Sequence, residues 1–121
     1  CLIPGIPEIS ANIEAISIVD KFLEHSRVFI FNNNGDPKVY LSSADWMTRN
    51  LSYRVETAFP ILDESIKKTI LELIDIQLND TVKARRIHYK KQNEYRKHKD
   101  IPIRTQVETY YYLKRKLNES N

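Results

Sequence analysis

A chain of 121 residues with 41% hydrophobic and 29% charged residues has the composition of one ordinary globular domain. Asp20, Lys21 and Glu24 interrupt its most apolar run, which excludes a membrane-spanning segment there, and the first residues lack the basic start and apolar core of a secretory signal. The single cysteine, Cys1, rules out an internal disulfide and fits a reducing compartment. We therefore expect a cytoplasmic protein.

The first residues read like the inside of a domain. The chain starts at Cys1 without an initiator methionine and runs directly into an apolar, proline-containing segment, residues 2–7. We interpret it as an excised fragment of a larger protein rather than as a processed product.

Positive charge is concentrated in one block. The whole chain carries a net charge of +3, but residues 83–99 contain eight lysines and arginines against one acid, Glu94, and so carry +7. A local basic block indicates either an anionic partner or a strongly solvated surface. The sequence alone supports both readings equally.

The first half of the chain is rich in predicted strands. Residues 12–22 are mostly apolar and fit a strand or a helical face. Residues 27–42 predict a β-hairpin, because two β-branched or aromatic runs flank the turn signal Asn34-Gly35-Asp36-Pro37. Ser43 or Asp45 is then expected to cap a short helical turn over 47–51, and the alternation over 53–59 predicts another strand.

The second half is predicted to be mainly helical. Residues 63–78 carry apolar side chains three or four apart behind the start signal Asp63, which predicts a helix. Residues 83–99 lack an apolar face and are expected to be irregular. A last helix is predicted over 105–117, with basic residues near its end as the helix dipole favours. This order predicts an α/β or α+β domain whose helices cover a mixed sheet.

Several kinds of site are excluded. With only two glycines, Gly5 and Gly35, the chain has no phosphate-binding loop and no dinucleotide-binding fingerprint. It also shows no Cys/His spacing typical of zinc, and we predict no metal ligands.

His25 is the first candidate for chemistry. It stands just before a predicted strand, and imidazole can donate a proton to a leaving oxygen or attack phosphorus near neutral pH. Arg27 lies two residues on, on the same side of an extended chain, and its planar fork suits phosphate oxygens. The structural alternative is a histidine that merely bonds a neighbouring carbonyl, and spacing alone favours it.

Residues 40–50 form the second candidate. A strand here delivers the hydroxyls of Ser42 and Ser43 and the carboxylate of Asp45 into a tight turn. Asp45 is a possible partner for His25 that would set its tautomer, while Arg49 and Arg54 follow closely. Taken alone, a capped turn with Trp46 and Met47 in the core explains the segment better.

The two segments in this order resemble half of a phospholipase D-like site, in which His-x-Lys, a strand pair and Gly-Ser-Ala-Asn occur and two halves make one site. Arg27 stands in place of the lysine and Ser42 in place of the glycine. Longer strings are more specific: residues 1–7, 16–20, 22–27, 40–50 and 80–85 are similar to the C-terminal region of bacterial polyphosphate kinase of the first type. That resemblance covers essentially the whole chain.

The resemblance implies a function for the whole enzyme. Members of this family move the γ-phosphoryl of ATP onto inorganic polyphosphate, reversibly and with Mg²⁺, through a phosphohistidine in an upstream phospholipase D-like domain. Residues 1–121 would then be the second such domain, inactive alone and dependent on the upstream domains of the same enzyme. ATP or ADP and polyphosphate are the expected partners, with no nucleic acid, and a homo-oligomer is expected at full length.

The resemblance also implies roles for residues. His25 matches the histidine of the second domain, which acts as an acid or an orienting group. Arg54 matches an arginine near the phosphates, with Arg49 and Arg27 as weaker candidates. Asp45, Ser42 and Ser43 are expected to support the site.

Two other functions compete with this reading. One is a phospholipase D-like phosphodiesterase or nuclease that uses His25 as nucleophile and a homodimer to complete the site, against which the substitutions at Arg27 and Ser42 count. The other is a non-catalytic polyanion-binding module, such as a nucleic-acid binder, suggested by the basic block and the tyrosines near it.

Overall fold

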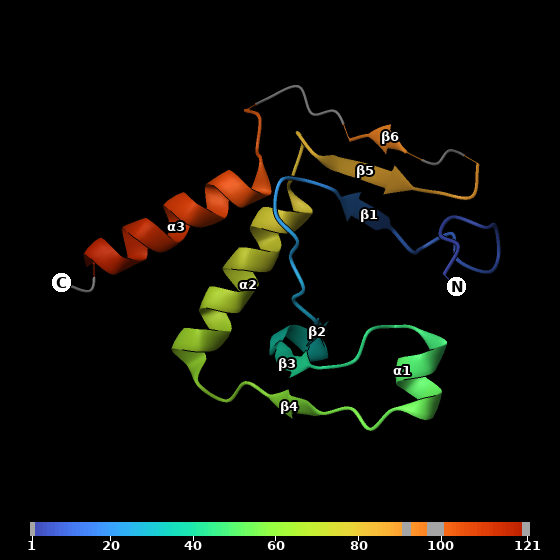
Figure 1. The fold of residues 1–121 in the computed structure, drawn as a ribbon, viewed down its shortest axis with the longest axis horizontal. Coiled ribbons are helices and arrows are strands. Elements are labelled where there is room, and N and C mark those ends of the chain that lie inside the picture. The colour runs from blue at the N-terminus through green and yellow to red at the C-terminus, as the bar shows by residue number, and fades with distance from the viewer. Residues whose placement is uncertain (1, 91–92, 97–100, 120–121) are drawn as a thin grey trace. The chain divides into compact units, whose positions relative to one another are not determined.

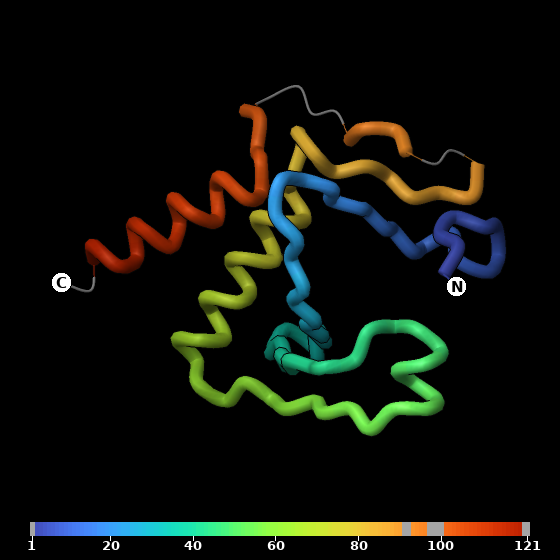
Figure 2. Tube along the Cα trace, viewed as in Figure 1, coloured from blue at the N-terminus to red at the C-terminus, as the bar shows by residue number. Residues whose placement is uncertain are grey.

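A computed structural model describes residues 2–90, 93–96 and 101–119. The chain forms two compact units: Cys1–Leu23 with Glu72–Asn121, here called the terminal unit, and Glu24–Leu71, the central unit. The helix α2 (Glu64–Leu78) begins in the central unit and ends in the terminal unit. Figure 1 shows the elements of each unit, and Figure 2 shows the path of the chain through them.

The central unit is built on a three-stranded antiparallel sheet in the order β2-β3-β4. Strands β2 (Val28–Phe31) and β3 (Lys38–Ser42) form the hairpin predicted over 27–42, which is therefore confirmed. The turn contains a short 3₁₀ segment η1 (Asn33–Gly35), where all three residues have positive φ. Asn and Gly are the residues that adopt this conformation most readily, so the turn follows directly from the local sequence. Val39, on β3, is only 1% exposed.

The remaining elements of the central unit differ from expectation in detail. The predicted helical turn is present as α1 (Thr48–Tyr53), but Met47 precedes it in an extended conformation with no side-chain cap. The prediction of Ser43 or Asp45 as the cap is thus wrong, because both side chains bond elsewhere. The strand predicted over 53–59 is shorter in the structure, where β4 comprises only Ala58–Pro60. The helix α1 continues through Tyr53, and only these three residues pair with β3.

The terminal unit contains a second antiparallel sheet, in the order β1-β5-β6. Strand β1 (Ala15–Ile18) settles the ambiguity over residues 12–22 in favour of a strand. Strands β5 (Ala84–Ile87) and β6 (Glu94–Tyr95) fall within the basic block, so the expectation of an irregular segment is wrong for these residues. Pairing with β1 on one side and β6 on the other makes β5 a strand despite its lack of apolar alternation. Of the block's residues, 91–92 and 97–99 lie outside the described part.

Both long helices are confirmed. In α2, the Asp63 carboxylate accepts the Ile66 N–H at 2.9 Å, which is the capping interaction expected at its start. The last helix, α3 (Thr105–Glu119), begins where predicted and extends two residues beyond the expected end. Within the described residues, no helix is long and apolar enough to cross a membrane.

The α/β fold class is confirmed, since strands and helices alternate along the chain. The strands described form two antiparallel sheets rather than the single mixed sheet that was expected.

Candidate functional site

The hairpin of the central unit brings the two candidate segments together. Arg27 O accepts the Ser42 N–H at 3.0 Å, which extends the pairing of β2 and β3 by one residue beyond the strands. The chain then turns at Ser42, whose hydroxyl accepts the Ala44 N–H at 3.0 Å. This turn carries Asp45 back toward the residues that precede β2, so two segments 18 residues apart meet at one end of the sheet.

His25, Arg27 and Asp45 form a contiguous polar cluster. Arg27 donates from Nε to Asp45 Oδ1 at 2.6 Å and from Nη2 to Oδ2 at 3.4 Å. His25 Nε2 lies 3.3 Å from Asp45 Oδ1 and also contacts Arg27 Nη2. The His25 side chain is 63% exposed, whereas those of Arg27 and Asp45 are 22% and 27% exposed. The cluster thus presents an accessible imidazole on a more protected ion pair.

The ion pair keeps both of its members charged. The hydrogen bond from Arg27, followed by its positive charge, holds the pKa of Asp45 below its ordinary value against the effect of burial. The same bond raises the pKa of Arg27. Asp45 is therefore a carboxylate at neutral pH, and it can only accept hydrogen bonds.

The two neighbours of His25 Nε2 make opposite demands on it. Arg27 has only donors, so it bonds to Nε2 when that nitrogen carries a lone pair. Asp45 has only acceptors, so it bonds to Nε2 when that nitrogen carries a proton. When Nε2 loses its proton, its hydrogen-bond partner therefore changes from Asp45 to Arg27. When Nε2 gains a proton, the partner changes back to Asp45. Such a ring is suited to proton transfer, because either protonation state finds a hydrogen bond at short range.

A second cluster, centred on Glu56, was missed by the sequence analysis. Its carboxylate accepts hydrogen bonds from the Ser43 hydroxyl and, at 2.8 Å, from the amide of Asn50, which is 3% exposed. The Ser43 hydroxyl also accepts the Thr57 N–H at 3.0 Å. The bond from Ser43, then that from Asn50, lowers the pKa of Glu56, and the charges of Arg54 and Arg27 act in the same direction. The sequence offered one indication of this cluster: an acidic residue two positions after Arg54, within the segment 53–59 that was predicted only as a strand.

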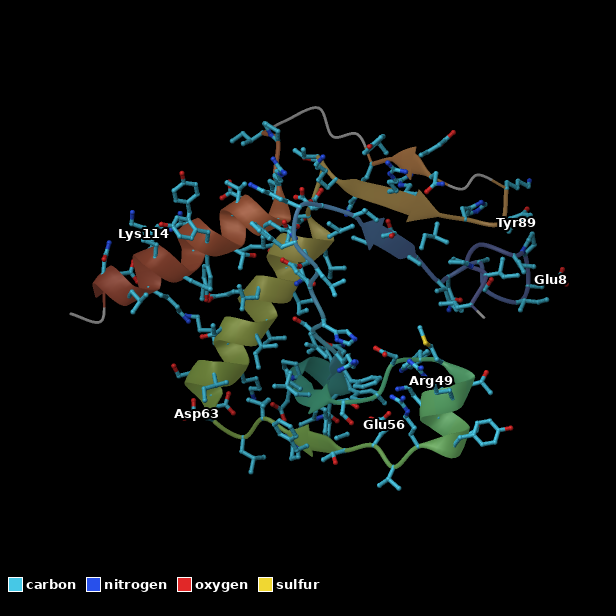
Figure 3. All side chains as sticks on the ribbon, in the orientation of Figure 1. Glu8, Arg49, Glu56, Asp63, Tyr89 and Lys114 are labelled. Atoms are coloured by element: carbon cyan, nitrogen blue, oxygen red, sulfur yellow. The ribbon has the colours of Figure 1, made fainter. Side chains whose placement is uncertain are left out.

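Arg49 and Arg54 flank this region without joining the first cluster. Arg49 lies in α1 and Arg54 follows its last residue, and Figure 3 labels Arg49 and Glu56 on these neighbouring segments of the central unit. Both arginines are exposed, and the guanidinium group of neither forms a hydrogen bond or ion pair with another residue in the described part of the chain. Their guanidinium groups are therefore available to an anion. Arg27, in contrast, uses its Nε and Nη2 donors internally.

Within residues 2–90, 93–96 and 101–119, no three His, Cys, Asp or Glu side chains are grouped so that they could hold a metal ion.

Known proteins resemble this chain along most of its length. The family model described as "Polyphosphate kinase C-terminal domain 2" matches residues 1–106. The chain is 54% identical over 119 residues to polyphosphate kinase of Escherichia coli K12 and 48% identical over 114 residues to that of Vibrio cholerae, in each case across 93% of this chain. It covers 17% and 16% of the length of these two relatives.

A solved structure shows the same fold. The crystal structure of polyphosphate kinase from Porphyromonas gingivalis matches all of this chain with a TM-score of 0.93 and 44% sequence identity, over 18% of the length of that chain. The phospholipase D-like α/β fold expected from the sequence is confirmed by this match.

Proposed function

Since the chain belongs to the polyphosphate kinase family, we propose that it forms part of an enzyme that reversibly transfers the γ-phosphoryl group of ATP to inorganic polyphosphate. The observation that carries the proposal is the match to the family model over residues 1–106. In this proposal the chain is the second phospholipase D-like domain, residues 1–121, and the phosphorylated histidine belongs to another domain of the enzyme. The chain alone is then inactive.

His25 is proposed as the acid or orienting group opposite the phosphorylated histidine. Its imidazole is exposed, and its Nε2 has a partner in either protonation state, Asp45 or Arg27. Transfer through a phosphohistidine divides one difficult displacement into two easier ones, and each needs a proton donor or acceptor near the oxygen that leaves or attacks. The ion pair between Arg27 and Asp45 holds the ring in place, and Ser42 shapes the turn that presents Asp45.

Arginines are proposed to bind the phosphates. Phosphoryl transfer is accelerated mainly by positioning and by positive charge around the moving group. Arg54 and Arg49 suit this role because their guanidinium groups are exposed and unpaired among the described residues. Arg27 contributes charge and the donors that Asp45 and His25 leave unused. The bonded pair of Ser43 and Glu56 supports the segment that carries Arg54.

Further properties of the whole enzyme follow from the same proposal. ATP or ADP and polyphosphate are its substrates, and Mg²⁺ accompanies the nucleotide. We also propose a cytoplasmic location, in solution or peripherally at the inner membrane, and a homo-oligomeric enzyme without a nucleic-acid partner.

The decisive experiment uses the enzyme that contains this chain. His25→Ala should abolish incorporation of labelled γ-phosphate into polyphosphate without loss of folded protein, whereas the neighbouring Ser26→Ala should leave incorporation near normal. Retained activity in the His25 variant would remove this residue from the mechanism. Synthesis of polymer by the isolated chain would contradict the proposed division between domains, and hydrolysis of a simple phosphodiester by it would support the phosphodiesterase alternative.

A further inference from the structure

We propose that the terminal unit carries a separate polyphosphate-binding site, in a pocket between its first loop and the end of β5. The pocket has a volume of about 330 Å³ and is lined by, among others, Gly5, Glu14, Arg86 and His88. None of these residues belongs to the cluster around His25. The inference rests on the proposed function only in the choice of polyphosphate as the polyanion.

The first loop is bonded to the residues that follow β5. The Tyr89 N–H donates to Pro4 O at 3.2 Å, and the Ser10 hydroxyl ties the loop together by accepting the Ile6 N–H at 3.0 Å and donating to Ile3 O at 2.7 Å. Figure 2 shows this loop beside the turn that follows β5, and Figure 3 labels Glu8 and Tyr89 at this end of the unit. Hydrogen bonds within the loop and one to Tyr89 therefore fix the segment that forms this wall of the pocket.

Gly5 allows the ring of His88 to lie close to the loop. Its φ of +84° favours glycine, and a Cβ at this position would overlap the edge of the His88 ring that carries Nε2. His88 Nδ1 accepts the Lys90 N–H at 3.2 Å, so a neutral ring carries its proton on Nε2. The ring therefore has a fixed orientation and a defined donor on the side of the pocket wall.

The two adjacent arginines of β5 differ in how they are used. Arg85 donates to the Tyr95 hydroxyl at 2.8 Å and lies 4.5 Å from the centre of the Tyr95 ring, so its guanidinium already has partners. Arg86 is exposed and lines the pocket, and its side chain forms no hydrogen bond or ion pair with other residues that the structure describes. An arginine at a pocket with unused planar donors is well suited to phosphate oxygens.

Two carboxylates limit the affinity of the pocket. Glu14 is part of its lining, and Glu94 stands opposite Arg86 in the register of β5 and β6. The described residues of the basic block, 83–90 and 93–96, nevertheless carry five lysines and arginines against Glu94, a net charge of +4, so the field around β5 favours anions. Removal of the Glu14 charge should strengthen binding, which is the opposite of the effect expected on removal of the Arg86 charge.

The arrangement favours a chain of phosphates over a single one. Arg86, His88 and Lys90 follow one another within five residues, and Lys90 stays beside His88 through its backbone bond. A linear polyanion with a charge on every repeating unit can contact several of these groups at once, whereas inorganic phosphate contacts one or two. The gain from linked contacts then appears as a dependence of affinity on chain length.

The same residues are less suited to nucleic acid. Non-specific binding of single strands relies on aromatic faces that are free to stack on bases. Here Lys90 Nζ lies 5.3 Å from the centre of the Tyr89 ring and Arg85 lies over Tyr95, so both rings already have cationic partners. We therefore expect a ligand that offers phosphate charges but no bases to stack.

The test measures binding of labelled polyphosphate of defined length to the 121-residue chain at several salt concentrations, with folding of each variant checked by circular dichroism. Arg86→Gln should weaken binding about tenfold and lower the dependence of log K on log salt by about one. Arg86→Lys should retain most of the affinity. Arg115→Gln, which removes the same charge from an exposed position on α3, should bind like the unchanged chain. Glu14→Gln should bind about twofold to threefold more tightly.

Several outcomes would overturn the proposal. Equal losses from Arg86→Gln and Arg115→Gln would show only general attraction to positive charge, and an unchanged affinity in Arg86→Gln would exclude the pocket. Displacement by a single-stranded oligonucleotide as effective as by polyphosphate of the same charge would assign the surface to nucleic acid instead. His25→Ala should bind polyphosphate at this pocket normally, so failure here and failure of the proposed function are separate results.

Discussion

Replacement of Asp80 should destabilise the terminal unit strongly. Its carboxylate is 0% exposed and accepts four backbone N–H groups. Oδ1 receives those of Val82, Lys83 and Ala84 at 3.0, 2.6 and 2.8 Å, and Oδ2 receives that of Thr105, the first residue of α3, at 2.8 Å. One side chain therefore joins the start of β5 to the start of the last helix.

The size of the effect follows from the groups left without partners. Ala84 and Thr105 are fully buried, so Asp80→Ala leaves two N–H groups shielded from water, each costing about 1–3 kcal/mol. We expect a loss of about 4 kcal/mol in the free energy of unfolding. Asp80→Asn keeps one oxygen but turns an NH₂ group toward an N–H, so we expect about half of that loss.

Acid should remove the same contribution. Burial opposes ionisation of Asp80, but the N–H groups of Thr105, Lys83 and Ala84 outweigh it and hold its pKa below the ordinary value. Because the pKa is lower in the folded than in the unfolded state, the stabilisation is complete above the unfolded value of about 3.9. It disappears as the pH falls through the folded value. The stability difference between the unchanged chain and Asp80→Asn should therefore narrow below about pH 4.

Urea unfolding of the 121-residue chain, followed by circular dichroism, measures these differences. Asp36→Asn is the matched control, since its carboxylate is exposed and bonds only to the exposed Lys38 in the described part of the chain, and little change is expected. A loss below about 1 kcal/mol in Asp80→Ala would refute the view that this carboxylate organises the unit.

The remaining predictions concern the candidate site and the pocket wall. In the whole enzyme, Arg54→Gln should lower kcat/KM about a hundredfold and Arg49→Gln about tenfold, because each removes positive charge near the phosphates; equal, near-normal steady-state rates would contradict both assignments. Asp45→Asn should lower kcat about tenfold with little change in KM, since it releases Arg27 and removes one partner of the imidazole; a change in KM alone would indicate a role in binding instead. Gly5→Ala should weaken binding of polyphosphate to the isolated chain, because the new Cβ displaces the His88 ring; unchanged affinity in a binding titration would show that the ring position is irrelevant.

Elements with local signals could be predicted from the sequence. The hairpin over 27–42 follows from a turn whose Asn and Gly residues adopt positive φ, and α2 follows from the spacing of its apolar residues behind the cap Asp63. The last helix also begins where its pattern starts. In each case the residues that stabilise the element lie within a few positions of one another, so the sequence contains the necessary information.

The basic strand β5 could not be predicted in this way. Its partners are β1, about 70 residues earlier, and β6, and its first N–H, that of Ala84, donates to the buried Asp80. Arg85 and Arg86 carry no apolar alternation, so only pairing with distant segments identifies them as part of a strand.

For the candidate site, too, the sequence predicted some features and only the tertiary structure decided others. The sequence by itself predicted His25, Arg27 and Asp45 as site residues, because their residue types and order resemble a known half-site. Only the tertiary structure decided that Arg27 bonds to Asp45 and contacts His25, and that Glu56 gathers Ser43 and Asn50. The physical reason is that these contacts depend on the register of β2 against β3 and on the end of β4, and such pairings between separate segments leave no local pattern in the chain.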